Sequence, residues 1–292
     1  MTKDRTLTAR VGFRLGHRPV AKRVTQQGFN HLLAILICVV MYAPVHLVVV
    51  NSLKDRTDAR SMSIERPTTL HWENYSTVIE RAKLGQAFLN SVLYSSSATL
   101  LATLLAAMAA YVMSRNKTRL NRFLYFFIIM GIAMPINFFS LTKVMQVTHL
   151  INTQIGIIIL YTATQLPFST FLIYGFVETL PRELDEAAIV DGAGPLRLFF
   201  ILILPLLTPV LATSALLNFL GIWNDFIFPL YYLNDSSKWP MPLAVYNFFG
   251  QFESSWNLVS ADIVLTVLPV IAVYLLGQRF IVSGMTAGSV KG

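Results

Sequence analysis

Residues 180–209 read LPRELDEAAIVDGAGPLRLFFILILPLLTP, with a charged first part and an apolar second part. Pro181 suits the first turn of a helix, and the acidic residues after it place negative charge at the positive end of the helix dipole. Gly192 and Gly194 end this short helix, and Pro195 restarts a helix that continues into the apolar part. The pattern predicts a short polar helix, a turn and a second helix that enters a membrane.

The composition of the whole chain is that of a membrane protein. Of its 292 residues, 54% are hydrophobic and 13% are charged, whereas a soluble domain carries about 25% charged residues. A mean hydropathy of +0.58 over this length exceeds what one buried core absorbs, so the excess apolar surface faces lipid. Cys38 is the only cysteine, which excludes an intrachain disulfide and a cysteine-based metal site.

Long runs without Asp, Glu, Lys or Arg give the number of membrane spans, since a spanning helix needs about 20 apolar residues. Five such runs occur at 24–53, 84–114, 123–142, 144–177 and 198–224. A sixth, 263–278, is counted because the charged side chains at its ends reach outward to the interfaces. Leu and Ala runs with Gly and Pro inside them favour helices over an outer-membrane barrel. We therefore predict an all-α, polytopic membrane protein with six transmembrane helices.

Basic residues set the orientation of these spans. Seven of the 23 Lys and Arg residues lie in the first 23 positions, which keeps the N-terminus in the cytoplasm. Six spans return the C-terminus to the same side, and 15 of the 23 basic residues then face the cytoplasm. The basicity is therefore a topology signal and no longer supports nucleic-acid binding. The predicted regions are a cytoplasmic basic segment at 1–29, a transmembrane domain at 30–283 with a cytoplasmic loop at 180–197, and a cytoplasmic tail at 284–292.

Two outer loops follow from this topology. The loop at 54–83 alternates charges and is expected to contain an amphipathic helix near its end. The loop at 229–261 is rich in aromatic residues. An interfacial belt and a protein-docking surface are the two alternatives for these aromatic side chains.

The predicted loop helix carries a recognisable motif. Glu186, Ala187 and Ala188 are followed, after three residues, by Gly192. This pattern resembles the EAA loop of ABC-importer permeases, in which a short helix docks into the ATPase subunit. By itself the motif is weak, because Ala-rich helices that end in Gly are common. Its place in the cytoplasmic loop before the penultimate span makes it specific.

Further short pieces resemble the carbohydrate branch of these permeases, which includes the second membrane subunit of the maltose importer. The resemblance runs from about residue 30 to the end and rests on Pro67-Thr68, Asn74-Tyr75, Asn90-Ser91, Ala110-Tyr111, Ser114-Arg115, Met134-Pro135, Asn152-Thr153, Pro167-Phe168, Trp223-Asn224-Asp225, Gln278-Arg279 and the tail 284–292. Val190 and Ser289 depart from the usual residues of the branch without changing the assignment. An alginate-oligosaccharide importer is a more specific hypothesis, which no motif selects.

The resemblance implies an ABC type I importer permease fold and oligosaccharide transport in the bacterial cytoplasmic (inner) membrane. It implies a homologous second permease, two ATPase subunits and an external solute-binding protein as partners. The sequence holds no GxxxxGK[ST] phosphate loop, so ATP and Mg²⁺ are expected on the ATPase subunits, and this chain is expected to hold no cofactor, no metal and no catalytic site. The residues expected to couple to the ATPase are Glu183, Glu186, Ala187, Ala188, Asp191, Gly192 and Gly194. The alternative is a solvated loop helix, with Gly192 as its C-cap.

A stripe on the fifth span predicts the substrate path. Small and polar residues recur there at i, i+4, i+7 and i+11, which is one face of a helix, and they are Ser214, Asn218, Gly221 and Asp225. Lipid would leave the amide of Asn218 and the carboxylate of Asp225 without partners, so the stripe is expected to face the partner permease or a water-filled cavity. Trp223 and Asn224 complete the candidate set. The alternatives are small-residue helix packing and, for residues 223–225, an interfacial anchor.

Two other classes of membrane protein fit less well. An ion-coupled secondary transporter keeps carboxylates or histidines at mid-membrane, where each charge costs roughly 2.5–3.5 kcal/mol. The five long runs contain no carboxylate. A membrane enzyme needs a catalytic cluster, and the sequence holds no HExxH motif. An ABC importer for another polar solute is therefore the nearest alternative.

Overall fold

The computed structural model describes residues 20–249 and 254–287, almost all of them in helices. The chain divides into two units, residues 1–47 and 48–292. In the first unit the structure describes one helix, α1, which runs from Val20 to Ser52 and so ends in the second unit. From Gly28 to Ser52 this helix has a mean hydropathy of 2.6 and mostly exposed apolar side chains, as expected of a helix surrounded by lipid.

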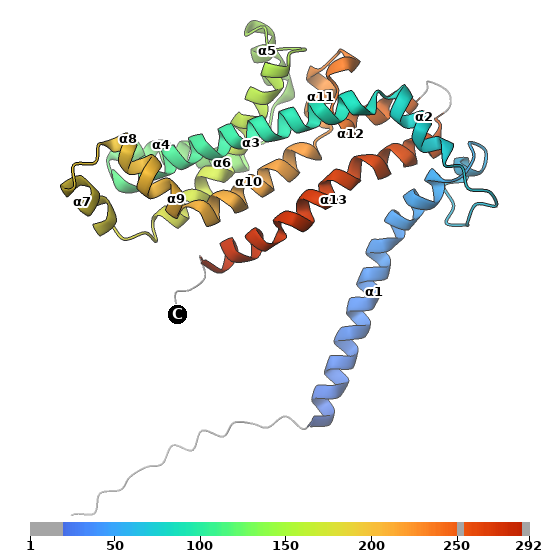
Figure 1. The fold of residues 1–292 in the computed structure, drawn as a ribbon, viewed down its shortest axis with the longest axis horizontal. Helices are drawn as coiled ribbons and strands as arrows, with labels where there is room; N and C mark the ends of the chain where they lie inside the picture. Colours follow the sequence, from blue (N-terminus) through green and yellow to red (C-terminus); the bar gives the residue numbers. More distant parts are fainter. Residues whose placement is uncertain (1–19, 250–253, 288–292) are drawn as a thin grey trace, which may run out of the picture. The chain divides into compact units, whose positions relative to one another are not determined.

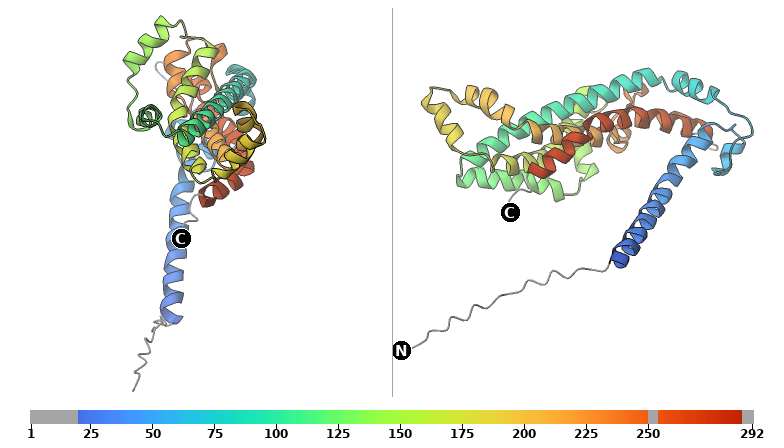
Figure 2. Two further views of the ribbon diagram at one scale, coloured as in Figure 1. Left: turned by 90° about the vertical axis from the view of Figure 1, so that its left-hand side faces the viewer. Right: turned by 60° about the horizontal axis from the view of Figure 1, so that its bottom comes forward.

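Four long helices form the bundle of the second unit. They are α3 (Leu84–Arg115), α6 (Gln154–Val177), α10 (Thr208–Trp223) and α13 (Trp256–Ala287). α3 packs along α6 and α10, and α10 packs against α13 (Figure 1, Figure 2). Small residues on α3 allow the neighbouring helices to pack close to it. Ala98, Ala102 and Ala106 follow one another on one face of α3 and are fully buried.

Two of the six predicted spans are broken helices. The run 123–142 becomes α4 (Arg119–Ala133) and α5 (Phe138–Val147), and the chain bends by 117° between them. The run 198–224 begins with α8 (Pro195–Arg197), the π-helix η2 (Leu198–Ile203) and α9 (Leu204–Leu206), and it bends by 77° at Leu207 before α10. In the described part of the chain, four helices are long and apolar enough to cross a membrane, namely α1, α3, α6 and α13. The number rises to six if each bent pair counts as one span.

Prolines explain both breaks. Met134 is extended, with φ −81° and ψ 119°, because the Pro135 ring disfavours the helical conformation in the residue before it. Pro209 has no N–H to donate to the carbonyl of Pro205. The Thr208 hydroxyl donates to that carbonyl instead, at 2.6 Å. This bond satisfies the backbone at a bend inside an apolar segment, where water is scarce.

Short helices cover the two ends of the bundle. α7 (Glu183–Val190) and α8 lie at one end, and α2 (Glu73–Arg81) lies at the other (Figure 1). The aromatic-rich region after α10 contains α11 (Ile227–Tyr232), η3 (Ser236–Lys238), α12 (Met241–Ala244) and η4 (Val245–Phe248). Tyr232 and Phe248 are buried in core clusters, whereas Tyr231, Tyr246 and Phe249 are exposed. Part of the aromatic set is therefore core, and the rest is available to an interface or a partner.

Asn74 of α2 bonds to neighbouring segments at the end of the bundle opposite α7. Its side-chain amide donates to the carbonyl oxygens of Ser52 at 2.9 Å and Lys54 at 2.8 Å. Its side-chain carbonyl accepts the amide of Asn257, on α13, at 2.8 Å. Since Asn74 and Asn257 are both buried, these bonds fix α2 against α13.

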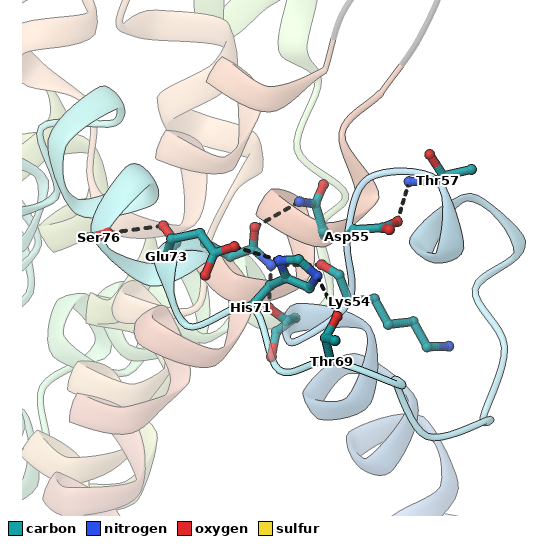
Figure 3. Close-up of polar contacts among 10 residues, drawn as sticks. Lys54, Asp55, Thr57, Thr69, His71, Glu73 and Ser76 are labelled. Atoms are coloured by element: carbon teal, nitrogen blue, oxygen red, sulfur yellow. Dashed lines mark hydrogen bonds and ion pairs between the residues drawn. The ribbon is translucent and has the colours of Figure 1, made fainter.

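The loop before α2, which begins at residue 53 and includes η1 (Asp58–Ser61), is held by local polar contacts (Figure 3). The Asp55 carboxylate accepts the backbone N–H groups of Thr57 at 2.7 Å and Asp58 at 2.8 Å. These bonds, the one from Asp58 first, hold the pKa of Asp55 below its ordinary value. The His71 ring bonds to the Glu73 carboxylate in the first turn of α2. The Asp55 carboxylate therefore orders the backbone of this loop.

Candidate coupling site

α7 has the ends that its sequence predicts. It begins after Pro181 with three acidic residues in its first turn. Gly192 has a φ of +79°, in the left-handed region. The N–H of Gly192 donates to the carbonyl of Ile189 at 3.0 Å, and the N–H of Ala193 donates to the carbonyl of Ala188 at 2.9 Å. This pair of bonds is a Schellman ending, so the predicted turn at Gly192 is present.

Ile189 and Val190 form an exposed apolar tip at the end of α7, and acidic residues lie beside it. Val190 is 86% exposed and Ile189 is 61% exposed. Glu186 and Asp191 are exposed beside them. Of the predicted coupling residues, Ala188 is half-buried, and the exposed ones are Glu183, Glu186, Ala187, Asp191, Gly192 and Gly194. A projecting, exposed apolar pair with charges around it has the character of a surface that docks into another protein.

The opposite face of α7 is fixed to the end of α3. Asp185 is only 8% exposed. Its carboxylate lies 2.8 Å from Nε of Arg115 and accepts the hydroxyl of Tyr111 at 2.6 Å. The Arg115 and Asp185 side chains are each 12% exposed, so solvent screens this ion pair less than a surface pair. These contacts set the direction in which the tip of α7 points.

The segment between α6 and α7 is held by the same end of α3. Glu178 accepts the hydroxyl of Ser114 and the ammonium of Lys117, the latter at 3.0 Å. Burial alone would raise the pKa of Glu178, but the bonds from Ser114 and Lys117 outweigh it, and the pKa of Glu178 lies below its ordinary value. Arg115 also donates to the carbonyl of Leu180 at 3.2 Å. The end of α3 therefore contacts the chain both before α7 and within it.

The predicted substrate-path residues divide into two groups. Ser214, Asn218 and Trp223 are buried within this chain. The Asn218 amide donates to the Ser169 hydroxyl of α6 at 2.8 Å, and the Trp223 indole N–H donates to the carbonyl of Thr266, on α13, at 3.3 Å. In this chain these three side chains pack α10 against its neighbours.

The other members of the set reach the surface of α10. Gly221 and Asn224 are exposed, and Asp225 is half-buried and accepts the Tyr161 hydroxyl at 2.9 Å. The amide of Gln165, on α6, lies beside Gly221, 3.5 Å from where a β-carbon would stand. The structure thus places the half-buried Gln165 beside Gly221 and leaves Gly221 and Asn224 exposed, whereas Ser214, Asn218 and Trp223 are buried.

Comparison with known proteins identifies the family. The sequence profile of the family described as "Binding-protein-dependent transport system inner membrane component" matches residues 102–287, a stretch that contains α7 and its turn. The chain belongs to this family of inner membrane transport components. The prediction of a binding-protein-dependent permease is therefore confirmed.

Two curated relatives cover nearly all of this permease. The diacetylchitobiose uptake system permease protein NgcG of Streptomyces coelicolor is 35% identical over 266 residues, which are 90% of this chain and 88% of the relative. The melibiose/raffinose/stachyose import permease protein MelC of Bacillus subtilis is 32% identical over 275 residues, which are 93% of this chain and 99% of the relative.

A solved structure confirms the fold. One chain of a bacterial ABC transporter involved in the import of the acidic polysaccharide alginate superposes with a TM-score of 0.76 and covers 90% of this permease and 98% of that chain. The two sequences are 21% identical, so this likeness concerns the fold. The predicted all-α ABC permease fold is the one observed.

Sequence reasoning predicted α7 and the turn at Gly192, and both are present. It missed the exposed apolar pair at the end of α7 and the contacts that α7 makes with α3. The exposed Ile189 and the Tyr111–Arg115–Asp185 contacts were not predicted. Tyr111 and Arg115 belong to recognised motif pieces, but their partner is remote in the sequence, 74 residues from Tyr111. The available signal was an acidic residue on the otherwise apolar face of α7, between Leu184 and Ala188.

Proposed function

We propose that this chain is one of two membrane subunits of an ATP-driven ABC importer for oligosaccharides in a bacterial cytoplasmic membrane. In this proposal it forms half of the translocation path and pairs with a homologous permease, two ATPase subunits and an external solute-binding protein. ATP and Mg²⁺ bind to the ATPase subunits, and this chain performs no covalent chemistry. Closure of the ATPases moves α7, and the attached helices alternate the access of the path between the two sides.

The exposed tip of α7 is the observation that carries this proposal. Ile189 and Val190 project from the end of the bundle with acidic residues around them, which suits insertion into an apolar cleft with basic edges on another subunit. Basic residues at the same end support a cytoplasmic location by the positive-inside rule, and they are Arg115, Lys117, Arg119, Arg122, Arg182 and Arg197. Both termini are then cytoplasmic if the chain crosses the membrane six times.

Support for a sugar substrate comes from the relatives, which are named for the uptake of short oligosaccharides. The surface around Gly221 fits this substrate class, because the amides of Gln165, on α6, and of Asn224, directly after α10, can bond to sugar hydroxyl groups. Asp225, the residue after Asn224, carries a carboxylate, which would repel an acidic sugar. This arrangement favours a neutral oligosaccharide over alginate.

Uptake by a reconstituted transporter tests the proposal. The chain is assembled in proteoliposomes with its partner permease, ATPase subunits and binding protein, and labelled neutral and acidic oligosaccharides are supplied. We expect neutral oligosaccharide to accumulate only with ATP, and we expect the purified chain alone to hydrolyse no ATP. Uptake driven by an ion gradient without ATP, or ATP hydrolysis by the chain alone, would contradict the proposal. ATP-driven uptake of a polar solute that is not a sugar would contradict the substrate assignment.

A further inference from the structure

The coupling helix is joined to the rest of the bundle by two unlike connections. Before α7, the end of α3 contacts the chain at Glu178, Leu180 and Arg182, and within α7 it contacts Asp185. After α7, the chain passes through Gly192 and Gly194 and then through the π-helix η2 and the bend at Leu207 before it reaches α10. The first connection is made of side-chain bonds and an ion pair, and the second is irregular backbone.

We propose that Arg115 and Asp185 are positioning residues that hold α7 rigidly to α3, so that movement of the docked tip is passed directly to α3 and α6. This inference rests on the proposed function, since it assumes that the tip docks into an ATPase subunit. Neither residue touches the ATPase in this account. They act through the direction and the stiffness of α7.

Three features of the ion pair suit it to this task. It is largely buried, with each side chain 12% exposed, so it persists at physiological ionic strength. One carboxylate oxygen of Asp185 accepts the Tyr111 hydroxyl, and the other lies 2.8 Å from Arg115 Nε as an ion pair without hydrogen-bond geometry. Arg115 also donates to the carbonyl of Leu180, which ties the base of α7 to the segment before it.

The helices to which the Arg115–Asp185 contact joins α7 are closely packed. α3 and α6 make the most extensive helix contact in the described part of the chain. Leu198 and Phe199 of η2 are buried in the same cluster as Ala106 and Ile173, which lie on α3 and α6. α10 is separated from α7 by the bend at Leu207. The tip, α3, α6 and the packed η2 therefore form the stiff part, and the bend at Leu207 is the joint.

A set of variants separates positioning from mere stability. Asp185→Ala leaves Arg115 buried without its partner, which by itself destabilises a protein. The double variant Arg115→Met/Asp185→Leu removes both charges and keeps the volume, and such replacements are often neutral for stability. If the pair served stability alone, the double variant would transport normally. If the pair positions α7, the double variant folds and assembles but transports poorly.

The test measures sugar transported per ATP hydrolysed in the complete reconstituted transporter. We expect the double variant to keep its thermal unfolding temperature and its amount of bound ATPase subunit, and to lower that ratio roughly 5-fold or more. Asp185→Glu should recover part of the ratio, because it keeps the charge. Lys117→Ala is the comparison variant, since it removes an ion pair at the same helix end whose Lys117 side chain is 53% exposed, and it should lower the ratio much less than the double variant does.

Val190→Asp distinguishes this inference from the proposed function. If Val190→Asp abolishes binding of the ATPase subunit while the double variant transports with the wild-type ratio, the positioning inference is wrong and the docking proposal stands. If Val190→Asp leaves both binding and transport intact, the docking proposal itself is wrong.

Discussion

At the scale of single residues, Gly192 is the position where backbone geometry and function coincide. Among the described glycines it has the one positive φ, +79°. A β-branched side chain there is strained by about 1–2 kcal/mol. The open space around Gly192 means that conformation, not crowding, is the limit.

We therefore expect Gly192→Val to shift the turn after α7 and to misplace its tip. Transport and substrate-stimulated ATP hydrolysis by the assembled transporter should fall together, while binding of the loaded solute-binding protein is retained. Gly194→Val is the matched control, because Gly194 is extended at φ −71° and ψ 163°, a conformation that valine adopts readily. Equal transport by the two variants would show that the turn geometry does not matter.

At the scale of secondary structure, the sequence predicted what local chemistry determines. The short helix at 183–190 and its glycine ending follow from Pro181, the acidic first turn and Gly192, and they were found. The breaks in two spans were missed, because counting charge-free runs measures apolarity and ignores the backbone. Pro135, Pro205 and Pro209 were the signals that hold this information.

The stripe on α10 shows a second limit of prediction from sequence. Helical spacing indicates which residues share a face, but not which neighbour covers it. Asn218 bonds to Ser169, on α6, so its partner lies within the chain, 49 residues away. Gly221 and Asn224, further along the helix, emerge from this packing. The pairing of Arg115 with Asp185 could not be predicted for the same reason, because helical spacing does not show which remote residue lies opposite a side chain.

Cysteine labelling along α10 tests which part of the stripe lines the path. In a Cys38→Ser background, we expect cysteines at 221 and 224 to react with a water-soluble thiol reagent in the assembled transporter. Cysteines at 214 and 218 should not react, because these positions are fully buried between helices. Sugar or trapped ATP should change the rate at 221 and 224. Labelling at 218 but not at 221 or 224 would reverse this assignment of the path.

At the scale of the whole molecule, the predicted six spans are reached when each bent pair is one span. The first 19 residues, the segment 250–253 and the last five residues lie outside the described residues, so most of the predicted basic segment and tail are not placed. α1 begins at Val20 and α13 continues to Ala287, so both terminal helices extend past the predicted boundaries at 29 and 284. The central claim, that the tip of α7 is the ATPase contact, rests on described residues alone.

That claim is tested most directly by oligosaccharide-stimulated ATP hydrolysis in the complete reconstituted transporter, compared between the wild type and Val190→Asp. A charge at this exposed tip costs the isolated chain little, because Val190 is 86% exposed. In a docked apolar cleft the same unpaired carboxylate is costly. We predict an unchanged unfolding temperature for the isolated chain and a loss of ATPase binding and of stimulated hydrolysis. Wild-type stimulation in Val190→Asp would contradict the account.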